Sequence, residues 1–345
     1  MRTGIFDGGR PRSGDRARRP IVAALALLLM AALPARAETI NIACQYGLAY
    51  IPFLLMEDQK LIEKHAAALG QADLVVNWLV LSGAAAMNDG LLSGSIAFGS
   101  GAPPALILLW DKTHASSNPV MGVGAIATMP TTLNTRNPAV REIADLSAAD
   151  RIAMPSVKIS NAALVLQMAA AKQWGADQYA RLDPLIITLG HPDAAVQVMG
   201  KGEVNAHFAS PPFEHLELRN PAVHTILSSL DVMGDTSLTD VWTTSKFARE
   251  HQVAVQAMFD AMTDATARIN ADKSAAADLY LRITNDKIGK DALMKVLNNS
   301  HIIFSTTPLG TMAFAKFMRD TGTIKTIPAQ WQDYFLPVAR TLPGN

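Results

Sequence analysis

Two stretches of this chain follow the same plan, and this repeat limits the folds that the chain can adopt. In the first, a glycine loop precedes a helical run that ends near Gly94, and a short apolar run then leads to a Pro-Pro pair that starts at Pro103. In the second, the same order leads past Gly202 to a Pro-Pro pair that starts at Pro211, with equal spacing between glycine and proline. A repeated supersecondary unit of this kind predicts two lobes of one design.

Short apolar runs alternate with helical patterns between residues 39 and 230. This alternation is typical of an α/β fold in which helices flank mostly parallel sheets. The predicted strands are 39–44, 74–81, 96–99, 122–128, 151–154, 185–189, 204–208 and 224–230, and residues 131–145 form an extended crossover. From residue 247 onward the chain is mostly helical and amphipathic.

The N-terminus has the pattern of a secretory signal peptide. Six arginines precede the apolar run IVAALALLLMAAL, and Ala35-Arg36-Ala37 follows as a small-x-small cleavage pattern. An apolar run of 13 residues is short for a bilayer span. We therefore expect export by the general secretory route with cleavage after Ala37. An uncleaved membrane anchor is the alternative.

Cleavage after residue 37 leaves 308 residues, a length that suits two lobes better than one core. We expect residues 38–128 to form the N-terminal part of lobe 1 and residues 129–235 to form lobe 2. Residues 236–345 then return through a hinge and pack mainly on lobe 1. The only cysteine, Cys44, has no partner for an internal disulfide and lies in an apolar run, so we interpret it as a buried structural thiol.

Ligands of parallel α/β sheets bind in the crevice outside the carboxyl ends of the strands. The helices that follow present unpaired backbone N–H groups and the positive ends of their dipoles there. In this chain the corresponding loops are rich in Gly, Ser, Asn and Gln, although small hydroxyl residues at such places can serve only as helix caps. The candidate ligand contacts are Gln45, Tyr46, Gly47, Ser82, Gly83, Ser100, Gly101, Ser156, Ser160, Asn161, His191, Ser210 and Trp242.

Three aromatic residues are placed to line the crevice, namely Tyr46, Tyr50 and Trp242. Trp78 instead lies inside the strand-like run VVNWLVL, and we expect it in the core.

Motifs for catalysis or metal binding are missing from the sequence. His191, His207 and His215 are separated by 16 and 8 residues, without the close pair that is typical of a zinc site. Ser82 and Ser100 lack the G-x-S-x-G context of an activated serine. Neither a P-loop nor a G-x-G-x-x-G motif is present. We therefore expect no metal, no cofactor and no enzymatic activity.

Charge excludes some classes of partner. The signal segment contains seven of the 30 basic and two of the 30 acidic residues, which leaves a mature chain with a net charge near −5. Nucleic acids and anionic membranes select basic surfaces, so neither is an expected partner. One small anion needs only a local positive field. Lys158 and Arg136 are the basic residues nearest to the predicted crevice, and each either neutralises an anion or belongs to the ordinary surface.

The order of these motifs resembles a known family. The first strand ends in QYGLAYIPFLLMEDQKLIEK, and LSGAAAMNDGLLSGSIAFGSGAPP follows. The segment DLSAADRIAMPS then opens the second lobe, and MGKGEVNAHFASPP completes the repeat. Over essentially the whole mature chain, the sequence is similar to the nitrate/sulfonate/taurine class of solute-binding proteins of ABC importers.

The resemblance implies a two-lobed periplasmic-binding-protein fold of type II, with the ligand held between the lobes. It implies a monomeric periplasmic protein that captures a small organic or inorganic anion by cleft closure and delivers it to the permease and ATPase of an ABC importer. Two alternatives stay open. One is an enzyme on the same scaffold, related to the synthesis or binding of a pyrimidine precursor of thiamine, which would need a site rich in His and Cys. The other is a periplasmic protein that senses a ligand.

Overall fold

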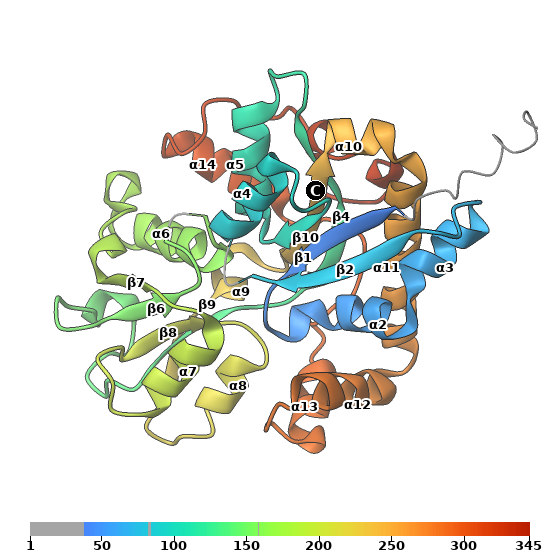
Figure 1. Cartoon of the computed structure of the whole chain (residues 1–345). Coiled ribbons are helices and arrows are strands. Elements are labelled where there is room, and N and C mark those ends of the chain that lie inside the picture. The colour runs from blue at the N-terminus through green and yellow to red at the C-terminus, as the bar shows by residue number, and fades with distance from the viewer. Residues whose placement is uncertain (1–37, 82–83, 158) are drawn as a thin grey trace, which may run out of the picture. The chain divides into compact units, whose positions relative to one another are not determined.

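Lobe 1 contains strands that are far apart in the sequence (Figure 1). In the computed structural model, which describes residues 38–81, 84–157 and 159–345, β1 pairs in parallel with β2, and β10 lies antiparallel between β3 and β4. A parallel bridge between Ile42 and Phe98 joins the two groups, so the strand order is β2-β1-β3-β10-β4. The strands are β1 (Thr39–Cys44), β2 (Val75–Val80), β3 (Gly99–Gly101), β4 (Val120–Thr128) and β10 (Ser237–Thr244).

Lobe 2 has a five-stranded sheet in the order β7-β6-β8-β5-β9. β6 runs parallel to β7 and β8, whereas β5 runs antiparallel to β8 and β9. The strands are β5 (Thr132–Thr135), β6 (Ile152–Met154), β7 (Ile186–Thr188), β8 (Ala206–Ala209) and β9 (His224–Ser228).

The two sheets share one plan, which confirms the predicted α/β fold of two similar lobes. In lobe 1, β1 lies between β2 and β3, and the antiparallel β10 separates β3 from β4. In lobe 2, β6 lies between β7 and β8, and the antiparallel β5 separates β8 from β9. The antiparallel strand comes from the neighbouring part of the chain: β5 enters lobe 2 directly after β4, and β10 returns to lobe 1 after β9. The sequence predicted the parallel strands but missed β10 as a strand.

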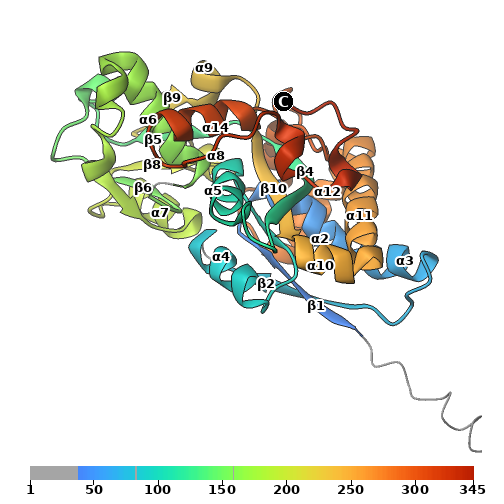
Figure 2. The ribbon, with the colours of Figure 1, turned by 90° about the horizontal axis from the view of Figure 1, so that it is seen from above.

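Helices cover both sheets (Figures 1 and 2). Lys60, in the left-handed conformation with φ 50°, separates α2 from α3. In the first half of the chain the helices are α2 (Ile51–Gln59), α3 (Leu61–Ala68), α4 (Ala84–Ser93), α5 (Pro103–Thr113) and α6 (Asn161–Trp174). They continue with α7 (His191–Met199), α8 (Phe213–Glu217), α9 (Ser229–Met233) and α10 (Ser245–Glu250). The C-terminal helices are α11 (Gln252–Ala271), α12 (Lys273–Thr284), α13 (Lys290–Leu297) and α14 (Thr311–Asp320).

The C-terminal helices contact elements of lobe 1. α11 packs against α2 and α3, α12 packs against α2 and α13, and α14 packs against α5. Among the described residues, no helix combines the length and apolar character that crossing a membrane requires.

β2 forms an exposed edge of the lobe 1 sheet. Val75 and Val80 are 43% and 53% exposed, and Trp78 is half-buried with its ring 5.1 Å from that of Phe53. Trp78 therefore packs against the core, as predicted, but is only partly buried because it lies on an edge strand.

Candidate ligand-binding site

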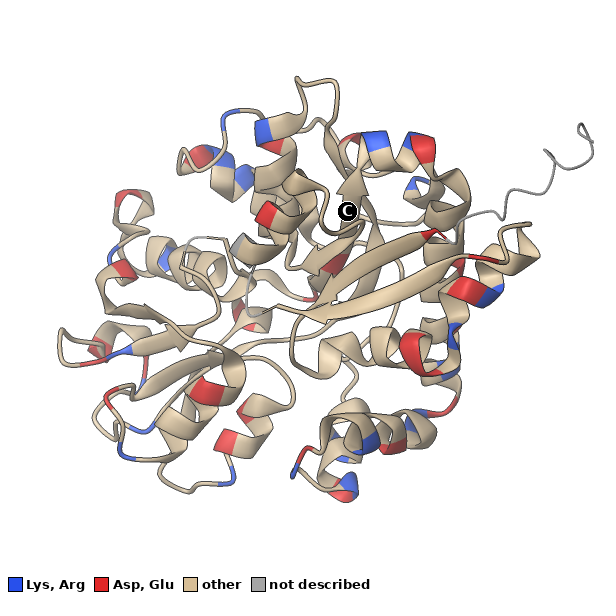
Figure 3. Ribbon diagram, viewed as in Figure 1, with Lys and Arg blue, Asp and Glu red and all other residues tan. Residues whose placement is uncertain are grey.

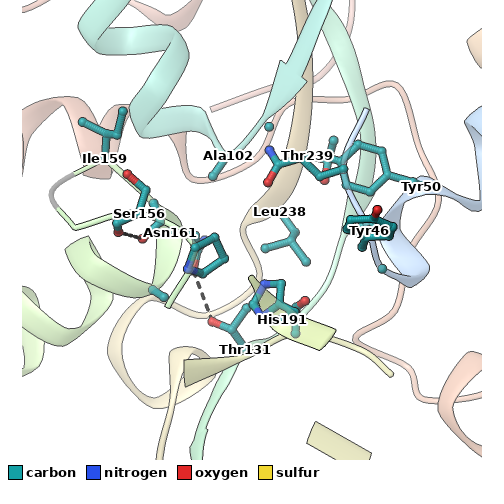
Figure 4. Close-up of a pocket in the computed structure, with 18 residues that line it drawn as sticks. Tyr46, Tyr50, Ala102, Thr131, Ser156, Ile159, Asn161, His191, Leu238 and Thr239 are labelled. Atoms are coloured by element: carbon teal, nitrogen blue, oxygen red, sulfur yellow. Dashed lines mark hydrogen bonds between the residues drawn. The ribbon is translucent and has the colours of Figure 1, made fainter. Parts of the chain in front are cut away.

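A cavity lies where loops of the two lobes meet (Figure 4). It holds about 620 Å³ of empty space, the solvent at its mouth included. Lobe 1 and β10 contribute Gln45, Tyr46, Gly47, Ala49, Tyr50, Gly101, Ala102, Leu238 and Thr239. Thr131 and lobe 2 contribute the rest, namely Pro155, Ser156, Ile159, Ser160, Asn161, Ala162, His191 and Ser210. A second hollow, lined by Leu81, Gly190, Pro192 and Asp193, adjoins the first and shares Gln45, Tyr46, Pro155 and His191 with it.

The structure brings nine of the candidate ligand contacts together around this cavity. They are Gln45, Tyr46, Gly47, Gly101, Ser156, Ser160, Asn161, His191 and Ser210. Ser82 and Gly83 lie outside the described residues, so their predicted role stays a prediction. Ser100 and Trp242 do not line the cavity.

Ser100 is fully buried within β3. Its hydroxyl donates a hydrogen bond of 2.6 Å to the carbonyl oxygen of Ala43 in β1. Neighbouring residues of a strand point to opposite faces, so Gly101 reaches the cavity while Ser100 joins β3 to β1. Its position therefore supports a structural role and does not support the predicted contact with a ligand.

Trp242 is fully buried in the lobe 1 sheet and packs on β3. A Cβ atom built on Gly99 would lie 2.6 Å from the Trp242 Nε1 atom, and one on Gly101 would lie 3.1 Å from the Cη2 atom. The glycines of the Gly-Ser-Gly strand thus make room for the indole ring. This position does not support the prediction that Trp242 contacts the ligand.

The segments that connect the two lobes contribute residues to the cavity that the sequence did not predict. Thr131 lies just before β5, and Leu238 and Thr239 lie at the start of β10, yet all three line the cavity. No motif marks them, because they reach the site through the long-range pairing of two antiparallel strands. Tyr50, which the sequence placed beside the crevice, also lines the cavity.

Three helices begin at the cavity. Ala102 is the N-cap of α5, Ser160 is the N-cap of α6, and His191 is the first residue of α7. The first turn of a helix has unpaired backbone N–H groups and a partial positive charge. Pro103 and Pro104 occupy the first two positions of α5, and Pro192 occupies the second position of α7, so these positions have no N–H to donate. The helix dipoles and the first turn of α6 therefore favour a negatively charged or strongly hydrogen-bond-accepting ligand group.

Ser160 acts as a helix cap. Its hydroxyl accepts a hydrogen bond of 3.1 Å from the backbone N–H of Ala163 and donates one of 2.6 Å to the carbonyl oxygen of Ser156. The capping alternative, left open by the sequence, thus describes what Ser160 does in this structure.

Asn161 has an unused donor beside the cavity. The residue is 3% exposed, and its Oδ1 atom accepts a hydrogen bond of 3.2 Å from the Thr131 hydroxyl. Its Nδ2 atom is buried and has no hydrogen-bond partner among the described residues. Buried polar groups are nearly always paired, so an unpaired donor next to a cavity indicates a place for a ligand acceptor.

Among the described residues, the first cavity has no charged side chain in its wall, and Asp193 lines the adjoining second hollow. None of the first cavity's described lining residues is Asp, Glu, Lys or Arg, and Figure 3 shows that charged residues lie mostly on peripheral helices and loops. Burial, and then the neighbouring His207, holds the pKa of His191 well below its usual value, so this imidazole is neutral at pH 7. Arg136 donates hydrogen bonds to the carbonyl oxygens of Gln197, Gly202 and Val204 and does not line the cavity. Lys158 lies outside the described residues.

The remaining reactive residue types are buried or paired. Burial, and then Glu57, raises the pKa of the Cys44 thiol to about 12, which disfavours the reactive thiolate. His207 is fully buried and contacts His191. Among the described residues, no three His, Cys, Asp or Glu side chains are arranged to hold a metal ion.

Comparison with known proteins defines the fold class. No protein-family model matches the sequence, and no curated protein matches it. Solved structures do match over nearly the whole length, and they identify the fold as that of periplasmic binding proteins. The resemblance drawn from the sequence is thereby confirmed at the level of the fold.

Particular neighbours bind sulfonates or nitrate. The alkanesulfonate-binding protein SsuA from Xanthomonas axonopodis pv. citri, solved with MOPS, has a TM-score of 0.65 and 18% identity, with 90% of this chain and 100% of that chain covered. The periplasmic aliphatic sulphonate-binding protein SsuA from Escherichia coli has a TM-score of 0.63 and 16% identity, with 86% and 97% covered. The nitrate-binding protein NrtA from Synechocystis PCC 6803 has a TM-score of 0.62 and 11% identity, with 86% and 84% covered.

Proposed function

We propose that this chain is the periplasmic solute-binding component of an ABC importer and that it captures a small anion of the sulfonate, taurine or nitrate type. The observation that carries the proposal is the cavity between two lobes, where three helices begin and where Asn161 has an unpaired donor. Helix N-termini and neutral donors hold anions without a fixed positive charge. The sulfonate- and nitrate-binding neighbours support the same ligand class.

Capture requires that the lobes open and close. We propose lobe 1 from 38–128, lobe 2 from 129–235, and a return through 236–345, with hinges where the chain passes from β4 to β5 and from β9 to β10. The backbone N–H of Leu48 donates a hydrogen bond of 2.9 Å to the carbonyl oxygen of Pro211, which joins the lobes beside the cavity. Hinge closure around a ligand is common in two-lobed binding proteins.

The proposed location and partners follow from this role. Residues 1–37, which lie outside the described residues, would direct export and be removed after Ala37. The mature protein would act as a monomer and deliver its ligand to a membrane permease with its ATPase. Nucleic acid is not a partner in this proposal, because the mature chain carries a net charge near −5.

The enzyme alternative lacks support at the site. Among the described cavity residues, the histidine is His191, and its recorded hydrogen bond goes to His207 and not to a serine. The only cysteine is a buried thiol. A ligand sensor, the other alternative, would use the same cavity as an import component.

Thermal unfolding and calorimetry of the processed protein test the proposal. The panel contains nitrate, bicarbonate, taurine, alkanesulfonates, aromatic carboxylates and pyrimidines, with chloride at equal ionic strength as the control. A true ligand at one hundred times its Kd should stabilise the protein by about 2.7 kcal/mol. If no compound of the panel binds or stabilises the protein, or if any compound is converted to a product, the proposed function is contradicted.

A further inference from the structure

A chain of buried hydrogen bonds runs from the cavity into lobe 2. His191 Nδ1 lies 2.8 Å from His207 Nε2, and His207 Nδ1 lies 2.5 Å from Glu217 Oε1. The other carboxyl oxygen of Glu217 accepts a hydrogen bond of 2.9 Å from the side-chain amide of Asn134. The Thr225 hydroxyl donates a hydrogen bond of 2.7 Å to Asn134 Oδ1, and the nitrogen end of that amide faces Glu217. We call His191, His207 and Glu217 the relay.

The surroundings keep the relay free of net charge. His207 and Glu217 are fully buried. Desolvation raises the pKa of Glu217 to about 8 and lowers that of His207 to about 3. Titratable groups on the adjoining elements are Asp193 on α7, Glu214 and His215 on α8, Tyr280 on α12, and Tyr46 and Tyr50 across the cavity. The positive charges nearby are Arg136, which donates to the Gln197 carbonyl of α7, and Arg219 and Lys295, which act on His215.

The proton count decides the direction of these hydrogen bonds. A protonated Glu217 donates to His207 Nδ1, and His207 then donates its Nε2–H to His191 Nδ1. If the same proton resides on His207 as an ion pair with Glu217, the Nε2–H of His207 still donates to His191. Either way a neutral His191 carries its own proton on Nε2. Loss of one proton from the relay reverses both bonds and turns His191 Nε2 into an acceptor.

The cavity side of His191 suits contact with a ligand. Its ring lies 5.6 Å from the Phe213 ring in a stacked arrangement, which fixes the plane of the imidazole. No hydrogen bond to Nε2 is recorded from the described residues, and His191 keeps part of its surface exposed.

We propose that Glu217 and His207 are positioning residues, which hold His191 with its Nε2–H available to a bound anion and thereby couple anion affinity to the proton of the relay. This inference rests on the proposed function for its ligand. The anion stabilises the protonated relay, so affinity is complete at low pH and falls as the pH rises through the pKa of the free relay.

The first test needs no ligand. ¹⁵N NMR of the histidine rings in the processed protein reports which nitrogen carries the proton. We expect the Nε2–H form of His191 near neutral pH and the Nδ1–H form once the relay loses its proton. An Nδ1–H form of His191 near neutral pH would overturn the proposal, whatever the protein binds.

The second test measures the affinity for methanesulfonate and nitrate, whose charges do not change between about pH 6 and about pH 10. In the unaltered protein the affinity should fall by up to about tenfold per pH unit above the pKa of the relay. Glu217→Gln donates permanently to His207 and should abolish this fall. His191→Phe, which keeps an aromatic ring beside Phe213, should also abolish it and should weaken binding at pH values below the pKa of the relay. His301→Gln, which alters a histidine paired with Asp235 outside the cavity, should keep the fall.

The outcomes separate the two proposals. A ligand whose affinity is the same from about pH 7 to about pH 9.5 would leave the proposed function intact and overturn the relay. If neither anion nor any other compound of the panel binds, the proposed function fails, and the relay as a ligand-linked device fails with it. In that case the His191 proton position from NMR still decides whether the relay has the direction described.

Discussion

Ser160 and Asn161 are adjacent in the sequence and serve different purposes at the cavity. Ser160 caps α6 with its hydroxyl, whereas Asn161 keeps a buried amide donor without a partner among the described residues. Both were predicted contacts because both follow β6. Sequence could not separate them, since the difference depends on the Thr131 hydroxyl that binds one end of the Asn161 amide.

Asn161→Ala should weaken ligand binding. A ligand acceptor left without the Asn161 donor loses about 1–3 kcal/mol, which corresponds to roughly tenfold or more in Kd. Calorimetry with the best ligand of the panel measures this change. The matched control is Asn298→Ala, which alters an exposed asparagine at the end of α13 with no recorded side-chain hydrogen bond. Equal affinity of the two variants would show that Asn161 does not contact the ligand.

At the level of secondary-structure elements, the two glycines of β3 make room for a side chain of β10. Between Phe98 and Ala102 the chain reads Gly-Ser-Gly, a pattern that the sequence placed at a ligand loop. The structure assigns Gly101 to the cavity, while Gly99 and Gly101 together accommodate the indole of Trp242 from β10. Strand β10 was not predicted, because TDVWTT lacks a clear alternation and its pairing partners are far away in the chain.

Gly99→Ala should destabilise the fold. Its Cβ would lie 2.6 Å from the Trp242 ring, so β3 or the indole must shift inside a packed sheet. Overpacking of this kind costs about 1–3 kcal/mol in the free energy of unfolding. Chemical denaturation measures this loss.

Gly90→Ala, within α4, is the control for this substitution, because its Cβ would lie 3.4 Å from its nearest neighbours, which are side-chain atoms of Ser95 and Ile96. Alanine is also favoured over glycine inside a helix. Gly90→Ala should therefore be neutral or stabilising. A loss of similar size in both variants would contradict the packing argument for Gly99.

At the scale of the whole molecule, the contact between the lobes decides whether the cavity is complete. Gly47 adopts φ 124° and ψ 168° directly before Leu48, whose N–H donates to the carbonyl oxygen of Pro211 in the other lobe, beside the cavity. This backbone conformation is nearly exclusive to glycine. The contact therefore depends on a residue without a side chain at position 47.

Gly47→Ala should lower the ligand affinity by about tenfold, since strain of about 1–3 kcal/mol would be released when the lobes separate. Calorimetry measures the affinity, and small-angle scattering with and without ligand reports closure. Gly70→Ala has comparable strain at φ 93° but has no neighbouring atoms within 4 Å. It should leave the affinity unchanged. Equal losses in both variants would argue against a role of Gly47 in closure.

The sequence by itself determined the α/β fold, the two similar lobes and most loops of the candidate site. These features depend on local periodicity and on glycine and proline positions, which act within a few residues. Tertiary structure alone decided that β5 and β10 enter each sheet antiparallel, that Ser100 and Trp242 belong to the interior, and that Thr131, Leu238 and Thr239 reach the cavity. It also brought His191, His207 and Glu217 into one buried line. The physical reason is that long-range strand pairing and desolvation depend on which distant segments meet, and local sequence patterns do not contain that information.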